Sequence, residues 1–212
     1  MQAVLFDFDG VVVRSMEDHY EGWRKALAEY GIDMGPEELY AMEGAGVKEL
    51  ASQFIRKFNL PRDETANIIQ KKRKYYEEIK KTELYPNLID VLHWIQERAL
   101  KAGVVTSGNR ERVIAALAEF GLTDHFPVII AAEDVFDPKP SPESYLRAAA
   151  LLDVEPAECI AIENSPYGIT SAKLAGMKCI ALTTTLSASY LKQADVIIRD
   201  LEEVLEALKK MY

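Results

Sequence analysis

The 212-residue sequence has only two cysteines, Cys159 and Cys179, and it lacks any apolar run of about 18 residues. Each cysteine precedes an isoleucine in an apolar segment, and neither has metal-type spacing to another Cys or His, so we expect reduced core residues. The missing apolar run argues against a transmembrane helix, and the acids after the first apolar segment are not typical of a signal peptide. We therefore expect a cytoplasmic protein that does not bind membranes.

Basic residues are also scarce, with 25 Lys and Arg against 34 Asp and Glu, which gives a formal net charge of −9. Proteins that bind nucleic acid without sequence preference show a basic surface, so the composition argues against that class. A local site can still bind a small anionic substrate. No internal repeat or low-complexity segment is present, and nothing indicates an interface, so we expect a monomeric globular protein.

Short apolar runs alternate with helical patterns along most of the chain. Most of the runs are apolar at consecutive positions, which is typical of strands covered on both faces in a parallel sheet. Strand and helix in alternation predict an α/β fold with a Rossmann-like open parallel sheet. The predicted strands are 4–6, 102–105, 128–131, 159–162, 178–182 and 195–198, and the predicted helices between them are 88–101, 110–120, 142–152, 169–175 and 201–211.

Residues 15–85 interrupt this alternation, because they contain no convincing strand. A crossover between parallel strands normally needs one helix, whereas four helical patterns occur here. We therefore expect a core domain formed by residues 1–14 and 86–212, with an all-helical domain inserted at 15–85. The four predicted helices are 16–30, 36–42, 47–58 and 61–80.

Polar residues follow four of the predicted strands. Ligands bind at the carboxyl ends of the strands in an open α/β sheet, so these residues are the candidates for a site. They are Asp7 and Asp9 after the first strand; Thr106, Ser107, Gly108 and Asn109 after the second; Lys139 in the loop after the third; and Glu163 and Asn164 after the fourth.

This set of side chains suits phosphoryl transfer. Carboxylate oxygens bind Mg²⁺, whereas Thr106 and Lys139 can bind phosphoryl oxygens. An aspartate can also act as the nucleophile and form an aspartyl-phosphate. Alternate residues of an extended chain point to the same side, so Asp7 and Asp9 should face one pocket while Phe8 faces the core.

Each feature also has a structural explanation when it is taken alone. Acids at a strand end can be solvated turn residues, and Thr106 can be a turn or helix-capping residue. Lysines are common on surfaces, although Lys139 lies between two prolines, and the segment around Glu163 can simply precede a helix that starts at Pro166. Their joint occurrence at consecutive strand ends favours a functional site.

Four segments, "DFDGV", "VVTSGN", "DPKPSPESY" and "IENSPYGITSAKLAGM", resemble the motifs of the haloacid dehalogenase superfamily. The last of them is similar to the branch that contains beta-phosphoglucomutase and phosphoglycolate phosphatase. The helical insertion resembles the cap domain of that family, and "LYPNLIDVLHWI" resembles the return from cap to core. The resemblance covers essentially the whole chain.

The resemblance implies a role for each motif residue. Asp7 would be the nucleophile, and Asp9 would be the general acid and then the base that activates water. Thr106 and the backbone N–H of Ser107 would bind a phosphoryl oxygen, with Gly108 and Asn109 also in the substrate-binding loop. Lys139 would offset negative charge. The retained Asp9 favours phosphoryl transfer over carbon–halogen cleavage, since dehalogenases of this family lack an aspartate there.

The implied Mg²⁺ site consists of Asp7, the backbone carbonyl of Asp9 and an acid in the fourth motif. Relatives commonly have Glu-Asp in that motif, whereas this chain has Glu163 and Asn164. An asparagine offers a neutral oxygen, so either of these two residues remains a candidate ligand. A second departure is Arg14, where relatives often carry aspartate. It can be a solvent-facing hinge residue or a contact for an anionic substrate.

The predicted function is a Mg²⁺-dependent phosphatase for a small phosphorylated metabolite. The candidate specificity residues on the cap are His19 and the glycine-bearing loop 43–48, which includes Gly44 and Lys48. A sugar-phosphate mutase is the main alternative, because His19 falls where that branch has a cap histidine and Lys74 falls near its cap lysine. No arginine for a distal phosphate is evident in the sequence. The less favoured alternatives are a phosphonatase, for which the basic cluster 71–74 could supply a lysine, and a catalytically silent relative.

Overall fold

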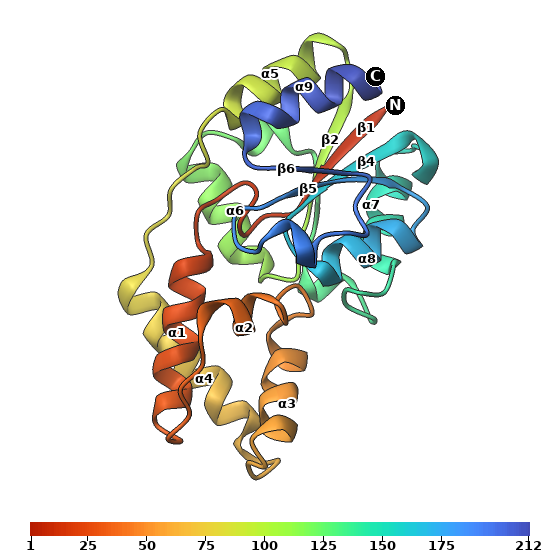
Figure 1. Cartoon of the computed structure of the whole chain (residues 1–212). Helices are drawn as coiled ribbons and strands as arrows, with labels where there is room; N and C mark the ends of the chain where they lie inside the picture. Colours follow the sequence, from red (N-terminus) through yellow and green to blue (C-terminus); the bar gives the residue numbers. More distant parts are fainter.

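The computed structural model describes residues 1–212 and contains a six-stranded sheet in the order β3-β2-β1-β4-β5-β6 (Figure 1). All five strand pairs are parallel, so the predicted α/β fold with an open parallel sheet is confirmed. The central position of β1 places its carboxyl end between those of β2 and β4. The strands are β1 (Ala3–Phe6), β2 (Lys101–Val105), β3 (Val128–Ile130), β4 (Cys159–Glu163), β5 (Lys178–Leu182) and β6 (Val196–Ile198).

Strand β1 is buried on both faces, which explains its unbroken run of apolar residues. Val4 and Phe6 belong to one hydrophobic cluster, whereas Ala3 and Leu5 belong to the cluster on the opposite face. Helices α5, α6 and α9 cover the first face, and α7 and α8 cover the second (Figure 1). Their bounds are α5 (Leu88–Glu97), α6 (Arg110–Glu119), α7 (Glu143–Leu151), α8 (Pro166–Leu174) and α9 (Leu201–Met211).

Several predicted helix boundaries differ from the observed ones by one to four residues, and the helix predicted at 61–80, for example, begins at Glu64. The helix predicted at 88–101 ends at Glu97, because Ala99 has a positive φ of 51° and Lys101 already belongs to β2. The helix predicted at 169–175 begins at Pro166, where Ser165 caps it by accepting a hydrogen bond from the Gly168 N–H. Proline is favoured in the first turn of a helix, so it starts this helix.

Four helices between β1 and α5 form a group of their own, which lies below the sheet in Figure 1. We call α1–α4 the helical group. Its apolar core includes Trp23 and Phe54, whose rings meet edge to face with centroids 5.1 Å apart. None of the helices of the structure has the length and apolarity of a membrane span. The bounds are α1 (Met16–Ala28), α2 (Pro36–Tyr40), α3 (Val47–Lys57) and α4 (Glu64–Ile79).

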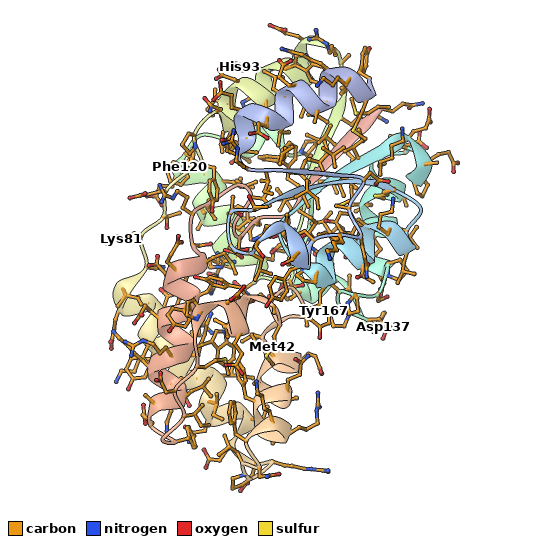
Figure 2. The ribbon with its side chains drawn as sticks, in the orientation of Figure 1. Met42, Lys81, His93, Phe120, Asp137 and Tyr167 are labelled. Carbon is orange, nitrogen blue, oxygen red and sulfur yellow. The ribbon has the colours of Figure 1, made fainter.

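Two adjacent chain segments connect the helical group to the sheet. Val13 and Leu84 form an antiparallel bridge, and the Arg14 N–H donates to the Glu83 carbonyl at 2.8 Å. The Arg14 side chain is exposed, which agrees with its interpretation as a solvent-facing hinge residue. Figure 2 shows Lys81 on the returning segment at the edge of the molecule. The pairing keeps the helical group close to the carboxyl ends of the strands.

Candidate active site

The carboxyl ends of β1, β2 and β4 open into a cavity of ≈ 610 Å³ between the sheet and the helical group. Asp7 follows β1, and its N–H donates to the Ile162 carbonyl at 2.9 Å, which continues the strand pairing for one residue. Every predicted site residue lines this cavity except Glu163. The lining residues are Asp7, Asp9, His19, Gly44, Lys48, Thr106, Ser107, Gly108, Asn109, Lys139 and Asn164.

Lys139 links two carboxylates below the cavity. Its Nζ donates to Asp7 Oδ1 at 2.8 Å, to Glu163 Oε1 at 2.6 Å and to the Val105 carbonyl at 3.0 Å. Burial opposes the charged form of Lys139, but Asp7 and Glu163 outweigh it and raise its pKa. Burial raises the pKa of Asp7 to about 7, although Lys139 opposes this shift. The Lys139 ammonium therefore pairs with the carboxylates of both Asp7 and Glu163.

Glu163 is fully buried and does not reach the cavity surface. It accepts hydrogen bonds from the Tyr145 hydroxyl at 2.8 Å and from the Ser165 hydroxyl at 3.2 Å, in addition to the one from Lys139. Gly168 leaves room for this carboxylate, because a Cβ there would lie 1.9 Å from Glu163 Oε1. Glu163 therefore holds the side chains of Lys139, Tyr145 and Ser165 in place by accepting their hydrogen bonds.

Asn164 is the fourth-motif residue that lines the cavity. Its amide lies against Gly10, where an added Cβ would be 2.1 Å from Asn164 Nδ2, and it donates to the Thr185 hydroxyl at 3.3 Å. Gly10 has a positive φ of 86°, which lets the chain turn away after Asp9. The sequence left open which of Glu163 and Asn164 faces the site, and the structure places Asn164 there.

Asp9 lines the same cavity as Asp7 and is held by three residues. The Ser15 hydroxyl donates to Oδ1 at 2.6 Å, His19 Nε2 lies 3.3 Å from Oδ1, and Arg112 binds both carboxylate oxygens. Burial raises the pKa of Asp9, but Arg112 and then His19 outweigh it and keep that pKa well below its usual range. Phe8, between the two aspartates, is buried in the core as predicted from alternation.

Sequence reasoning missed Arg112. It occupies the first turn of α6, directly above the end of β2, and Asn109 Oδ1 accepts a hydrogen bond from its backbone N–H at 3.1 Å. The sequence did offer one signal, because Arg112 lies three residues after Asn109, a polar residue that can cap a helix at the end of a strand. Asn109 itself caps α6 and donates to Glu133 at 2.6 Å, so both polar atoms of its side chain are already hydrogen-bonded within the protein.

The helical group contributes a chain of polar contacts to the cavity. Lys72 Nζ donates to His19 Nδ1 at 2.7 Å, which assigns the proton of the imidazole to Nε2, the atom that faces Asp9. Burial and the charge of Lys72 lower the pKa of His19 to about 4, and burial lowers the pKa of Lys72 to about 8. The sequence suggested Lys74 for this position, but Lys74 is exposed. Lys72 shares the buried face of α4 with Tyr76.

Glu43 is the first residue of the predicted contact loop 43–48, and it also faces Lys72. Burial raises its pKa to about 7 against the opposing charge of Lys72. Glu43 directly precedes Gly44, and no sequence pattern distinguishes it from a solvated loop acid. Its position depends on how the loop after α2 sits over the cavity.

Gly44 joins the helical group to the core. Its carbonyl accepts a hydrogen bond from the Ser107 hydroxyl at 2.6 Å, and its φ is +95°. A Cβ at this position would lie 2.6 Å from Ser165 Oγ, so only glycine fits. Lys48 is exposed at the rim of the cavity, and Thr106 is buried with its hydroxyl accepting from the Gly108 N–H at 2.9 Å.

The donor atoms at the cavity floor are oxygens. No three His, Cys, Asp or Glu side chains come together as a metal-binding cluster. Asp7, Asp9 and Asn164 are oxygen-bearing residues that line the cavity, and such oxygens suit a hard cation such as Mg²⁺. The residues present therefore fit Mg²⁺, with fewer charged ligands than a site with a second acid would have.

A sequence model of haloacid dehalogenase-like hydrolases matches residues 4–182. The chain belongs to the haloacid dehalogenase-like hydrolase family. This haloacid dehalogenase-like hydrolase is 32% identical over 205 residues to a validoxylamine A 7'-phosphate phosphatase of Streptomyces hygroscopicus subsp. limoneus, which covers 96% of this chain and 95% of the relative. It is 27% identical to a fructose-1-phosphate phosphatase of Escherichia coli K12, over 84% of this chain and 94% of the relative.

The haloacid dehalogenase-like hydrolase also resembles a solved beta-phosphoglucomutase of Clostridium difficile. The TM-score is 0.86 at 25% identity, with 99% of this chain and 96% of the other covered. The predicted family is thus confirmed, and the phosphatase relatives support the predicted class of enzyme.

Proposed function

We propose that this protein is a Mg²⁺-dependent phosphatase that hydrolyses a small phosphorylated metabolite through an aspartyl-phosphate on Asp7. The observation that supports this most is the pairing of Asp7 with Lys139 at the floor of the cavity, with Asp9 and Thr106 on the same cavity wall. An aspartate held in this way can attack a phosphorus atom, and the surrounding donors can neutralise the phosphoryl oxygens.

In the first step, Asp7 forms a bond to phosphorus while the bond from phosphorus to the leaving oxygen breaks. Asp7 Oδ1 is occupied by Lys139, so Oδ2 is the attacking atom. Thr106, the Ser107 N–H and Lys139 balance the negative charge on the phosphoryl oxygens. The leaving oxygen takes a proton from Asp9, which has to bind that proton when substrate enters.

In the second step, water attacks phosphorus and the bond to Asp7 breaks, which releases inorganic phosphate. Asp9 accepts the proton of the water. Its contacts with Arg112 and His19 favour the ionised form that this step requires. Mg²⁺ would be held by Asp7, the Asp9 carbonyl and Asn164, and when bound it supplies positive charge that favours ionised Asp7 and offsets the charge of the phosphoryl group.

We propose that residues 15–85 act as a cap over a core formed by residues 1–14 and 86–212. Ser107 and Gly44 connect the two parts on one side, and Asp9 and His19 connect them on the other. A cap closed in this way excludes bulk water and brings its own side chains to the leaving group. The leaving group is therefore recognised by cap residues such as Glu43.

A sugar-phosphate mutase is the second candidate. The contact between His19 and Lys72, and the resemblance to beta-phosphoglucomutases, favour it. The helical group contributes Arg73 to the lining of the cavity, but the arginine that binds Asp9 is Arg112 of the core. Incubation with a sugar 1-phosphate separates the two functions, because a phosphatase releases inorganic phosphate and a mutase forms the sugar 6-phosphate.

A panel of phosphorylated metabolites together with p-nitrophenyl phosphate tests the proposal. We expect Mg²⁺-dependent release of phosphate, abolished by EDTA and by Asp7→Asn. Asp137→Asn is the matched control, because Asp137 is an exposed loop acid away from the cavity floor (Figure 2). Turnover that survives in Asp7→Asn contradicts the assignment of the nucleophile.

A further inference from the structure

We propose that Arg112 is a positioning residue that fixes the Asp9 carboxylate in the cavity, and that Gly108 is required because it leaves space for this contact. The inference rests on the proposed function, since it concerns the orientation of the group that transfers the proton. It adds a residue outside the four motifs to the catalytic apparatus.

The contact between Arg112 and Asp9 has a fixed geometry. Arg112 Nη1 donates to Oδ1 at 2.9 Å, and Nη2 donates to Oδ2. The two side chains are 19% and 15% exposed, so the pair is largely shielded from water. A bidentate pair of this kind sets the plane of the carboxylate as well as its position.

Only Arg112 holds the second oxygen of Asp9. Ser15 and His19 both contact Oδ1, whereas the hydrogen bond to Oδ2 comes from Arg112. Oδ2 lies on the side of Thr106, since a Cβ placed on Gly108 would be 3.4 Å from Oδ2 and 3.2 Å from Thr106 Oγ1. Arg112 therefore determines which way Oδ2 points relative to the residue proposed to bind the phosphoryl group.

Two neighbouring residues hold Arg112 in place. The Asn109 side chain accepts its backbone N–H at 3.1 Å and fixes the first turn of α6. The guanidinium carbon lies 5.4 Å from the centre of the Phe8 ring, which gives it an aromatic support. The Phe8 that separates the two aspartates therefore also supports the arginine.

Gly108 has a steric role in this contact. A Cβ there would lie 2.5 Å from Arg112 Nη2, which is closer than a carbon and a nitrogen can approach without displacement. Its backbone does not require glycine, because Gly108 has no positive φ. A Cβ at this position would therefore displace the end of the Arg112 side chain from its contact with Asp9.

Arg112 could instead bind an anionic group of the substrate. Each of its two terminal nitrogens carries two N–H groups, and Asp9 accepts from one on each, so the other donors can bind an anion in the cavity while the pair stays intact. The two roles differ in how the loss of Arg112 depends on the leaving group. A residue that acts through the proton donor matters most when the leaving oxygen needs a proton.

Two aryl phosphates of similar shape, phenyl phosphate and p-nitrophenyl phosphate, provide the test, because nitrophenolate departs without much protonation. We measure kcat/KM, which reports the first step. Because Arg112 also favours ionised Asp9, its loss by itself would make protonation of Asp9 easier, so a slower first step reports the orientation of Asp9. For Arg112→Met we expect about a 100-fold loss with phenyl phosphate and less than about a tenfold loss with p-nitrophenyl phosphate. Arg112→Lys should recover part of the rate, since it keeps the charge but loses the bidentate geometry.

Three further variants complete the design. Arg112→Met should cause no additional loss in an Asp9→Asn background, because both changes remove the same function. Arg110→Met is the matched control, since Arg110 lies in the same turn but donates to the Ile129 carbonyl, away from the cavity. Gly108→Ala should show the leaving-group dependence of Arg112→Met.

The outcomes separate this inference from the proposed function. Wild-type protein without turnover contradicts both. Active wild type with equal losses on the two substrates, or with additive losses in the Asp9→Asn background, overturns the positioning role alone. Equal losses accompanied by a lower Tm would identify Arg112 as a structural residue, and a raised KM in the Asp9→Asn background would identify it as a substrate ligand.

Discussion

Lys139 Nζ lies 2.8 Å from Asp7 Oδ1, although 132 residues separate the two in the chain. Both side chains are buried, and the same ammonium also binds Glu163. A buried charge is tolerated when it is paired and hydrogen-bonded, so the three residues depend on one another. Loss of this contact should therefore affect both the proposed nucleophile and the stability of the folded protein.

Lys139→Met should abolish phosphatase activity and lower the free energy of unfolding by about 3–5 kcal/mol, because it leaves two buried carboxylates without their cation. Urea unfolding and p-nitrophenyl phosphate turnover measure the two effects. Lys101→Met, which removes an exposed lysine at the opposite end of β2, is the control. Full activity in Lys139→Met would contradict the role of the ammonium.

Gly44→Ala should lower kcat/KM by about tenfold or more, because a Cβ lies 2.6 Å from Ser165 Oγ and prevents the loop from seating on the core. Gly31→Ala is the matched control, since Gly31 also has a positive φ, 72°, but no atom within 4 Å of its Cβ position. It should cost about 1 kcal/mol of stability without affecting turnover. Similar kinetics for the two variants would refute the seating role of Gly44.

Asn164→Asp should reduce the Mg²⁺ concentration for half-maximal activity by about tenfold, because it adds a charged oxygen at the cavity floor. Asn164→Ala should raise that concentration. Titration of activity with MgCl₂ after EDTA treatment measures both. If neither variant changes the Mg²⁺ dependence, Asn164 is not part of the cation site.

Glu43 should make the stability depend on pH near neutrality. Burial raises its pKa from 4.5 to about 7, so between these values the folded protein holds a proton that the unfolded chain has released. The free energy of unfolding therefore falls as pH rises through this window. Glu43→Gln removes the effect and should be about 3 kcal/mol more stable than wild type at pH 8, whereas the difference should be less than about 1 kcal/mol near pH 5.

Urea unfolding at the two pH values checks this expectation. Glu37→Gln is the control for the loss of one charge, because Glu37 is exposed on α2 of the same helical group. Lys72 and Asp9 are the charged groups that act on Glu43, and neither is altered by the substitution. A stability difference for Glu43→Gln that does not change with pH would contradict the raised pKa.

Local patterns were sufficient to predict most of the elements. The apolar runs that became β1 and β5 were identifiable because strands buried on both faces are apolar at every position. The helical pattern of α8 was weak because it contains Gly168, although Pro166 offered a possible start, and Glu163 occupies the space that a Cβ on Gly168 would need. A steric contact with the end of the preceding strand thus weakened the local helical signal.

The sequence by itself determined the parallel sheet and the strand ends at which Asp7, Thr106, Lys139 and Asn164 occur, because strand burial and turn residues are written locally in the chain. Only the tertiary structure decided that Asn164 faces the cavity while Glu163 lies below it, that Lys72 rather than Lys74 reaches His19, and that Arg112 binds Asp9. These outcomes depend on the rotation of each helix and on packing between elements far apart in the chain. The residue pattern of one segment does not specify the rotation of its helix or its contacts with segments far away in the chain.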